Sequence, residues 1–206
     1  MNRTRSSNAW LREHVNDTYV QRAKAEGYRS RASYKLMGID DKDHLIHTGD
    51  VVVDLGASPG GWSQVVAKRQ HGKGQVIAVD LLEMDPLASV DFLQGDFREQ
   101  ILLDELEKRL AGKKLGLVLS DMSPNISGIA LCDQARVMHL AELALEFACN
   151  WLKPDGAFLV KVFQGHGFDD FVQQMRTKFR AVASRKPDAS RDRSPEIYLL
   201  GKNPRA

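Results

Sequence analysis

The chain has none of the features that would place it in a membrane or in an oxidising compartment. Its 206 residues contain no apolar run long enough to cross a bilayer, which takes about 18 residues, and residues 1–7 lack the apolar core of a secretory signal. It has only two cysteines, Cys132 and Cys149, and its six histidines show no spacing typical of a metal site. We therefore expect a cytoplasmic protein with reduced thiols and no bound metal.

A second absence concerns nucleotide cofactors. A dinucleotide-binding fold carries G-x-G-x-x-G where its first strand turns into a helix, and this pattern is missing. The glycines after the first β-branched run instead fall at Gly56, Gly60 and Gly61, with a proline between them. Residues 51–63 still predict a buried strand, a tight turn and the start of a helix. Free N–H groups and small residues at such a turn suit a polar ligand.

The net charge of +2 hides an uneven distribution. Residues 1–35 carry eight basic residues against three acids, and residues 176–206 carry nine against three. The remaining middle holds twelve basic and twenty-one acidic residues, so a body of net charge −9 is flanked by ends of +5 and +6. If the two ends meet in space, they form one positive surface suited to a polyanion. RNA is the candidate that we favour.

Apolar periodicity alternates between strand and helix patterns along most of the chain. We predict helices at 10–24, 62–70, 101–110, 134–151 and 168–179, and strands at 51–55, 75–81, 90–97 (with its loop), 115–121, 157–163, 180–187 and 196–200. This alternation predicts an α/β fold. We expect a single domain over 1–206, with a disordered start at 1–9, a basic helical segment at 10–36 and the catalytic core at 48–201.

Three acids stand at the carboxyl ends of predicted strands. These are Asp54, Asp80 and Asp121, and ligands of doubly wound sheets bind at this edge. Asp54 lies just ahead of the glycine turn, where an acid suits a ligand with an amino group better than one with phosphates. Asp80 follows the turn by about twenty residues, the place at which such folds hold ribose hydroxyls.

Lys161 stands in an otherwise apolar predicted strand, 157–163. A central strand offers no water to an ammonium group, and charged side chains are rarely buried unless they are paired or functional. The lysine is therefore a candidate for an active site. The alternative is a side chain that reaches solvent from near the end of the strand.

Basic and aromatic side chains are interleaved in residues 28–36. Such a mixture can grip phosphates while it stacks on bases or sugars. The candidate RNA contacts, here and near the other basic end, are Arg29, Arg31, Tyr34, Arg191 and Arg193. The alternative is a solvated helix whose tyrosines pack on the core.

Five short sequences carry a resemblance to a known family. They are R-S-R-A-S-Y-K-L ending at Leu36, D-L-G-A-S-P-G-G-W ending at Trp62, S-D-M-S-P-N around Asp121, K-V-F-Q-G starting at Lys161, and R-K-P-x-x-S-R-x-R-S-x-E ending at Glu196. Together they resemble the FtsJ/RlmE family of RNA ribose 2′-O-methyltransferases. The resemblance implies an α/β, Rossmann-like fold that depends on S-adenosylmethionine, with a mostly parallel seven-stranded sheet and helices on both faces.

The resemblance also implies roles for single residues. It makes Lys35, Asp121, Lys161 and Glu196 a catalytic tetrad. In our hypothesis Lys161 is the base or orients the ribose hydroxyl, and Asp121 orients Lys161. Lys35 and Glu196 complete the network and position the ribose. Whether the amine of Lys161 is neutral stays open, because its expected neighbours act in opposite directions.

The implied cofactor is S-adenosylmethionine. Its methionine end would lie on the glycine turn, its ribose on Asp80 and its adenine on Asp96, although a simple turn residue after Gly95 is the alternative for this last acid. The residues assigned to the cofactor are Asp54, Gly56, Gly60, Gly61, Trp62, Asp80, Asp96 and Asp121.

The implied substrate is a uridine ribose in 23S ribosomal RNA, methylated on the large ribosomal subunit by a monomeric enzyme. Two alternatives stay open. A tRNA ribose methyltransferase of the same family would carry the same motifs. A non-catalytic assembly factor would use the same fold, but the complete tetrad argues against it.

Overall fold

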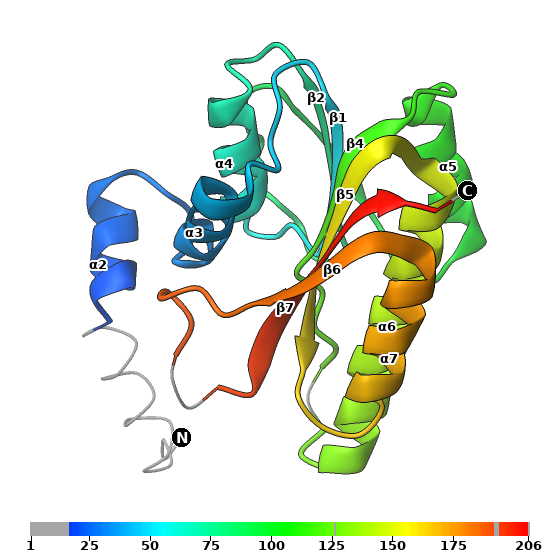
Figure 1. Cartoon of the computed structure of the whole chain (residues 1–206). Coiled ribbons are helices and arrows are strands. Elements are labelled where there is room, and N and C mark those ends of the chain that lie inside the picture. The colour runs from blue at the N-terminus through cyan, green and yellow to red at the C-terminus, as the bar shows by residue number, and fades with distance from the viewer. Residues whose placement is uncertain (1–16, 126, 192–193, 206) are drawn as a thin grey trace.

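A seven-stranded sheet runs through the part of the molecule that the computed structural model describes, residues 17–125, 127–191 and 194–205 (Figure 1). Its strands are β1 (Val51–Leu55), β2 (Gln75–Asp80), β3 (Val90–Gln94), β4 (Leu115–Ser120), β5 (Leu152–Phe163), β6 (Phe179–Arg185) and β7 (Glu196–Pro204). Their order across the sheet is β3-β2-β1-β4-β5-β7-β6. The chain thus starts in the middle of the sheet and builds outward first to one side and then to the other, as doubly wound folds do.

The seventh strand is inserted into the sheet and not added at its edge. Strands β1 to β5 pair in parallel, whereas β7 runs antiparallel between β5 and β6. This insertion makes Tyr198 on β7 the register partner of Lys161 on β5. Parallel strands covered on both faces are continuous apolar runs, which explains why every residue of β4 is buried.

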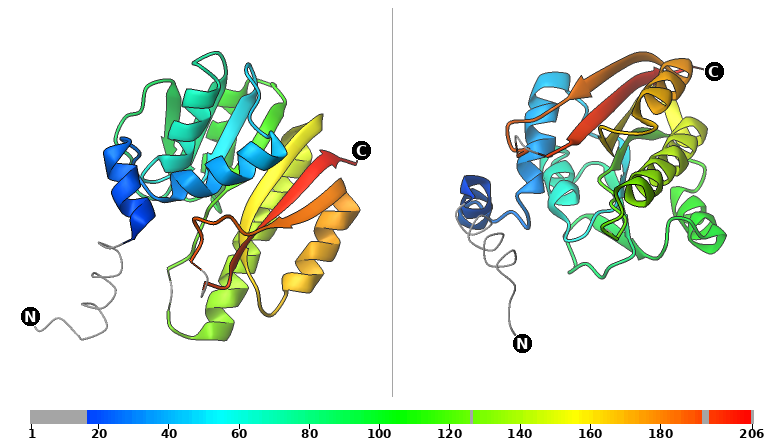
Figure 2. Two further views of the ribbon diagram at one scale, coloured as in Figure 1. Left: turned by 60° about the vertical axis from the view of Figure 1, so that its left-hand side comes forward. Right: turned by 90° about the horizontal axis from the view of Figure 1, so that it is seen from below.

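Helices cover both faces of the sheet (Figures 1 and 2). One face carries α3 (Ala32–Asp43) and α4 (Gly61–Arg69), with α2 (Thr18–Ala25) beyond α3, and the other carries α5 (Gln100–Leu110), α6 (Ala130–Trp151) and α7 (Phe168–Lys178). The predicted fold class is therefore confirmed. None of the helices in the described ranges is long and apolar enough to cross a membrane.

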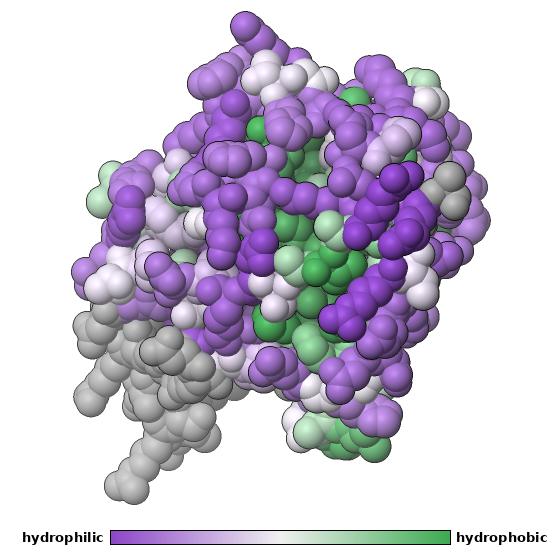
Figure 3. All heavy atoms as spheres, in the orientation of Figure 1, coloured by the Kyte–Doolittle hydropathy of each residue, from purple (hydrophilic) through white to green (hydrophobic). Residues whose placement is uncertain are grey.

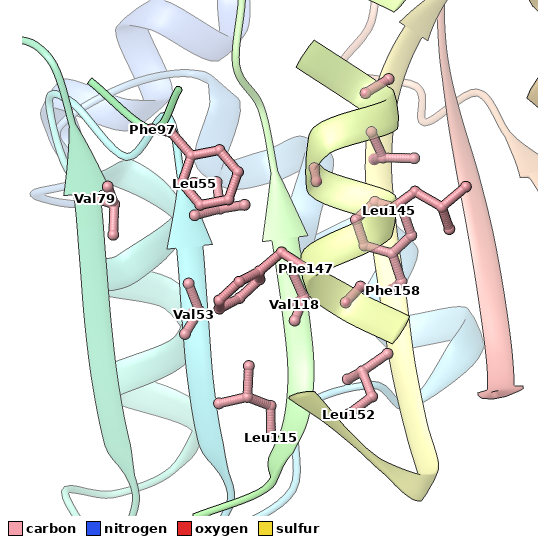
Figure 4. Close-up of a cluster of buried hydrophobic side chains, with 14 of the residues drawn as sticks. Val53, Leu55, Val79, Phe97, Leu115, Val118, Leu145, Phe147, Leu152 and Phe158 are labelled. Carbon is pink, nitrogen blue, oxygen red and sulfur yellow. The ribbon is translucent and has the colours of Figure 1, made fainter. Parts of the chain in front are cut away.

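Each face of the sheet has its own apolar core. On the α5–α7 side, Val53, Val118 and Phe158 from the strands meet Phe147 from α6 (Figure 4). On the other side Leu36 of α3 packs with residues of α4 and the central strands. The second core matters for function because packing in this core holds α3 over the ends of the strands.

Several element boundaries differ from the sequence prediction, and α3 (Ala32–Asp43) was predicted only as the end of the helical segment at 10–36. Helix α6 begins at Ala130, four residues early, and β7 continues to Pro204. Strand β5 begins at Leu152, because the expected turn after α6 forms an irregularity inside the strand between the pairs Leu115–Leu152 and Leu117–Ala157. The domain division stays a prediction, and its start at 1–9 lies outside the described residues.

Candidate active site

The glycine turn after β1 forms the floor of a cleft. The N–H groups of Gly56 and Ala57 both donate to the carbonyl of Val79, at 2.9 and 3.1 Å, and so fix the turn to β2. Gly56 has a φ of +78°, and a Cβ there would lie 2.7 Å from the backbone nitrogen of Met122. Only glycine lets the turn and the chain after β4 approach so closely.

The cleft has a volume of about 570 Å³ and lies at the carboxyl ends of β1 to β4. Its walls include Gly56, Ser58, Asp80, Asp96, Asp121 and the segment 122–125. Three of the acids that the sequence singled out therefore face one cavity of the size that holds a nucleoside-sized ligand.

Asp80 and Asp96 are held in different ways. Asp80 accepts from the N–H groups of Ser58 at 2.8 Å and Leu82 at 2.7 Å, so its carboxylate is oriented by backbone alone. Asp96 pairs with the side chain of Arg98, with a shortest distance of 2.6 Å, and this hydrogen bonding lowers the pKa of Asp96 to about 2. Both carboxylates are fixed acceptors at the cleft wall.

Asp54 lies beneath the turn and not on the wall of the cleft. Its carboxylate is fully buried, and one oxygen accepts from the Ser63 hydroxyl at 2.6 Å while the other has no partner in the described part of the chain. Burial raises the pKa of Asp54 to about 7, although the Ser63 hydrogen bond acts in the opposite direction. In the structure Asp54 orders the start of α4 through Ser63, and its direct contact with a cofactor stays a prediction.

Gly60, Gly61 and Trp62 face the N-terminal segment and not the cleft. A Cβ on Gly60 would lie 2.8 Å from a guanidinium nitrogen of Arg29, and one on Gly61 would collide with Ser30. The Trp62 indole is buried and donates to the carbonyl of Ala32 at 2.8 Å. Close packing against α3 and the segment before it accounts for the small size of the two glycines and for the place of the indole, and contact of these three residues with a cofactor stays a prediction.

Three members of the expected tetrad share one face of the sheet. Asp121, Lys161 and Glu196 fall on the same side of β4, β5 and β7 as Leu119 and Leu159, which face α3 and α4. Lys161 Nζ lies 3.1 Å from Asp121 Oδ1 and donates to the Asp121 carbonyl at 2.7 Å. The Lys161 side chain is 9% exposed. Its ammonium group, for which the sequence alone indicated no partner, therefore lies largely buried against the carboxylate of Asp121.

Helix α3 brings the fourth member across the strand ends. Lys35 Nζ lies 2.6 Å from Glu196 Oε1, and each side chain is 13% exposed. Burial raises the pKa of Glu196, but the charge of Lys35 and its hydrogen bond outweigh this effect, and the net pKa is lowered. The structure thus contains two buried lysine–carboxylate pairs side by side.

Tyr198 joins the two pairs, and sequence reasoning missed it. Its hydroxyl accepts from Lys35 Nζ at 3.3 Å and donates to Asp121 Oδ1 at 3.2 Å. The side chain is fully buried against Trp62, and burial together with the nearby carboxylates raises the pKa of Tyr198 well above its ordinary value. The available signal was its position two residues after Glu196 in a strand, which puts both on one face.

Most of the expected RNA contacts are engaged inside the protein. Tyr34 is buried between Tyr19 and Tyr28 and donates to Glu26 at 2.9 Å, which excludes base stacking on its ring. The Arg29 guanidinium donates to the carbonyls of three residues: Pro59, Asp85 and Pro86. Both side chains hold the N-terminal segment on the fold, and contact of Tyr34 and Arg29 with RNA stays a prediction.

The other three arginines have different outcomes. Arg31 pairs with Asp17 and donates to the carbonyl of Ala189, and its RNA contact stays a prediction. Arg191 lies 3.7 Å from Asp17 and keeps 29% of its side chain exposed, and its RNA contact stays a prediction. Arg193 lies outside the described residues. Among the described residues, no group of three or more potential ligands is arranged to hold a metal ion.

The sheet order and the cleft define a class of protein, the Rossmann-like methyltransferases. A methyltransferase of Streptococcus mutans, solved with S-adenosylhomocysteine, has this fold with a TM-score of 0.52 at 10% identity, over 84% of this chain and 95% of its own. A family model described as FtsJ-like methyltransferase matches residues 28–204. The chain belongs to this family.

Individual relatives agree with that assignment. The ribosomal RNA large subunit methyltransferase E of Dechloromonas aromatica is 64% identical over 202 residues, which cover 98% of each chain. The Chromobacterium violaceum protein of the same name is 58% identical over the full length of both chains. A Plasmodium falciparum protein described as a ribosomal RNA methyltransferase has 29% identity and a TM-score of 0.77, over 85% of this chain and 98% of its own. The resemblance seen in the sequence, and with it methyl transfer from S-adenosylmethionine, is confirmed.

Proposed function

We propose that this protein methylates the 2′-hydroxyl of a uridine ribose in 23S ribosomal RNA of the large subunit, with S-adenosylmethionine as the donor. One observation carries the chemistry. Asp121 lines the cleft and also pairs with Lys161. A single residue therefore connects the cleft, where a donor fits, to the two lysine–carboxylate pairs. An acceptor hydroxyl beside Lys161 would then lie next to the donor.

The cleft fits S-adenosylmethionine by the chemistry of its walls. Asp80 would accept from the ribose hydroxyls, and Asp96 would accept from the adenine amine. The Gly56 turn would leave room for the methionine part, while Asp121 would supply negative charge for the sulfonium. When bound, the donor supplies an electrophilic methyl group, and the protein has to align it and handle one proton.

The geometry of Lys161 suits the handling of that proton. Its Nζ donates to the Asp121 carbonyl at 2.7 Å and forms an ion pair with the carboxylate of the same residue at 3.1 Å. In its neutral form the amine would carry a lone pair that could accept the proton of a ribose hydroxyl placed beside it. Lys35 and Glu196 would then fix the ribose from the side of α3.

The proposed substrate rests on the relatives. The proteins of 55–64% identity that span nearly the whole chain carry the name ribosomal RNA large subunit methyltransferase E. The basic ends of the chain agree with an RNA partner. We further propose that the protein acts as a monomer in the cytoplasm, where large subunits are assembled.

The test is transfer of labelled methyl groups to intact large subunits, naked 23S RNA and bulk tRNA, by the wild type and by Lys161→Ala. We expect label on the subunits, in an alkali-resistant dinucleotide that marks a 2′-O-methyl group, and none with the variant. Label on tRNA alone would replace the proposed substrate with the nearer alternative. No transfer to any RNA by a protein that still binds the donor would overturn the enzymatic proposal.

A further inference from the structure

Asp17 connects the N-terminal segment to the far end of the chain. One carboxylate oxygen caps α2, accepting from the N–H groups of Tyr19 at 3.0 Å and Val20 at 3.4 Å. The other oxygen pairs with Arg31 and lies 3.7 Å from Arg191. The Asp17 side chain is 10% exposed and that of Arg31 is 17% exposed, so the pair is largely shielded from water.

Arg31 extends this contact to the connection between β6 and β7. One of its nitrogens pairs with Asp17, and another donates to the carbonyl of Ala189. The connection also folds on itself, because Ser190 N donates to the Pro187 carbonyl at 2.7 Å. The conformation of the connection therefore depends on a charged pair that comes from the opposite end of the sequence.

The residue after Ala189 reaches the tetrad. Ser190 is buried, and its hydroxyl donates to Glu196 Oε1 at 3.2 Å. The same oxygen accepts from Lys35 Nζ at 2.6 Å. A continuous series of contacts therefore runs from Asp17 through Arg31 and the connection to the lysine of α3.

We propose that Asp17 and Arg31 are positioning residues for methyl transfer, which hold the β6–β7 connection so that Ser190 and Glu196 fix Lys35 at the acceptor ribose. This inference rests on the proposed function. Neither residue lines the cofactor cleft, so their effect falls on the acceptor side of the reaction. Small displacements of positioning groups lower the rate because the reacting atoms must be aligned.

The variant Asp17→Asn separates this role from helix capping. Asparagine caps helices as well as aspartate does, so α2 is kept while the charged contacts to Arg31 and Arg191 are lost. With large subunits and donor both saturating, we expect kcat to fall about tenfold, with an unchanged Kd for S-adenosylmethionine measured by calorimetry.

Asp43→Asn is the matched control. Asp43 pairs with Arg185 at 2.6 Å, with side chains 8% and 22% exposed, and also ties α3 to β6. That pair makes no contact with Ser190 or Glu196. We expect Asp43→Asn to lower the melting temperature at least as much as Asp17→Asn does while it leaves kcat within about twofold of the wild type.

Two further readouts distinguish positioning from general stability. The Ser190 hydrogen bond helps to lower the pKa of Glu196, so the acidic limb of the kcat profile should move to higher pH in Asp17→Asn and not in Asp43→Asn. The kcat of the double variant Asp17→Asn/Arg31→Gln should be no lower than that of the less active single variant, because both changes break the same series of contacts.

Three results would overturn the inference: wild-type kcat in Asp17→Asn, equal loss of kcat in both Asn variants, or additive losses in the double variant. A wild type that methylates no RNA would instead overturn the proposed function, so the two failures are distinguishable.

Discussion

The cofactor cleft and the tetrad lie at the same edge of the sheet, but they are built in opposite ways. The cleft is assembled from neighbouring parts of the chain, residues 56–140, and much of its surface comes from turns and strand ends. The tetrad joins α3, the end of β4, β5 and β7, and its four side chains are between 9% and 20% exposed. Binding is thus encoded locally, whereas catalysis depends on long-range packing.

The largest effect is expected on the catalytic side. Lys161→Met keeps the length and apolar contacts of the side chain but removes the amine and its two contacts with Asp121. Loss of a group that handles the proton should lower kcat about a thousandfold. Single-turnover methyl transfer measures the rate, and calorimetry should give a donor Kd within about twofold of the wild type. A large loss of donor affinity would break the division between the two regions.

The next effect is expected on the binding side. In Gly56→Ala the new Cβ would lie 2.7 Å from Met122 N, so the turn must shift and donor affinity should fall by about tenfold or more. Gly128→Ala is the control, because Gly128 also has a positive φ, +87°, but open space around it. Both variants should lose about 1–2 kcal/mol of stability through backbone strain. Only Gly56→Ala should raise the Kd, and equal donor affinities would contradict the role of the close approach.

At the acid beneath the turn we expect an effect on stability and the smallest effect on the reaction itself. The pKa of Asp54 is about 7 in the folded protein, so the folded state keeps a proton that the unfolded state loses near pH 4. Stability should therefore fall as pH rises from about 4 to 7, by at most roughly 4 kcal/mol. Asp54→Asn should flatten the decrease in melting temperature between pH 5 and 8. Asp104→Asn, at an exposed position on α5, should leave that decrease unchanged.

Sequence reasoning predicted the cleft better than the rest. Asp80, Asp96 and Asp121 line it because each lies at or just after the end of a strand, and strand ends of a parallel sheet share an edge. The same logic did not predict that the carboxylate of Asp54 lies buried under the turn. Position along a strand predicts which edge a residue occupies, but not whether its side chain faces the ligand or the interior.

The tetrad and its surroundings needed information that no single segment holds. The convergence of Lys35 with Glu196 came from a family resemblance, because it depends on how α3 packs and on the insertion of β7. Charge patterning likewise found the basic N-terminal segment but did not predict that Arg31 pairs with Asp17, fourteen residues away. The partner of a basic side chain depends on how the chain folds, and the distribution of charge along the sequence does not contain this information.

The place of β7 has a consequence for the synthesis of the enzyme. Chains leave the ribosome N-terminus first and begin to fold in that order, so β1 to β4 emerge well before β7. A growing chain that stops short of residue 196 has the strands of the donor cleft, but it lacks Glu196 and Tyr198, and its β6 lacks the strand with which it pairs. The same late strand therefore completes the sheet and brings Glu196 and Tyr198 to Lys35 and Asp121.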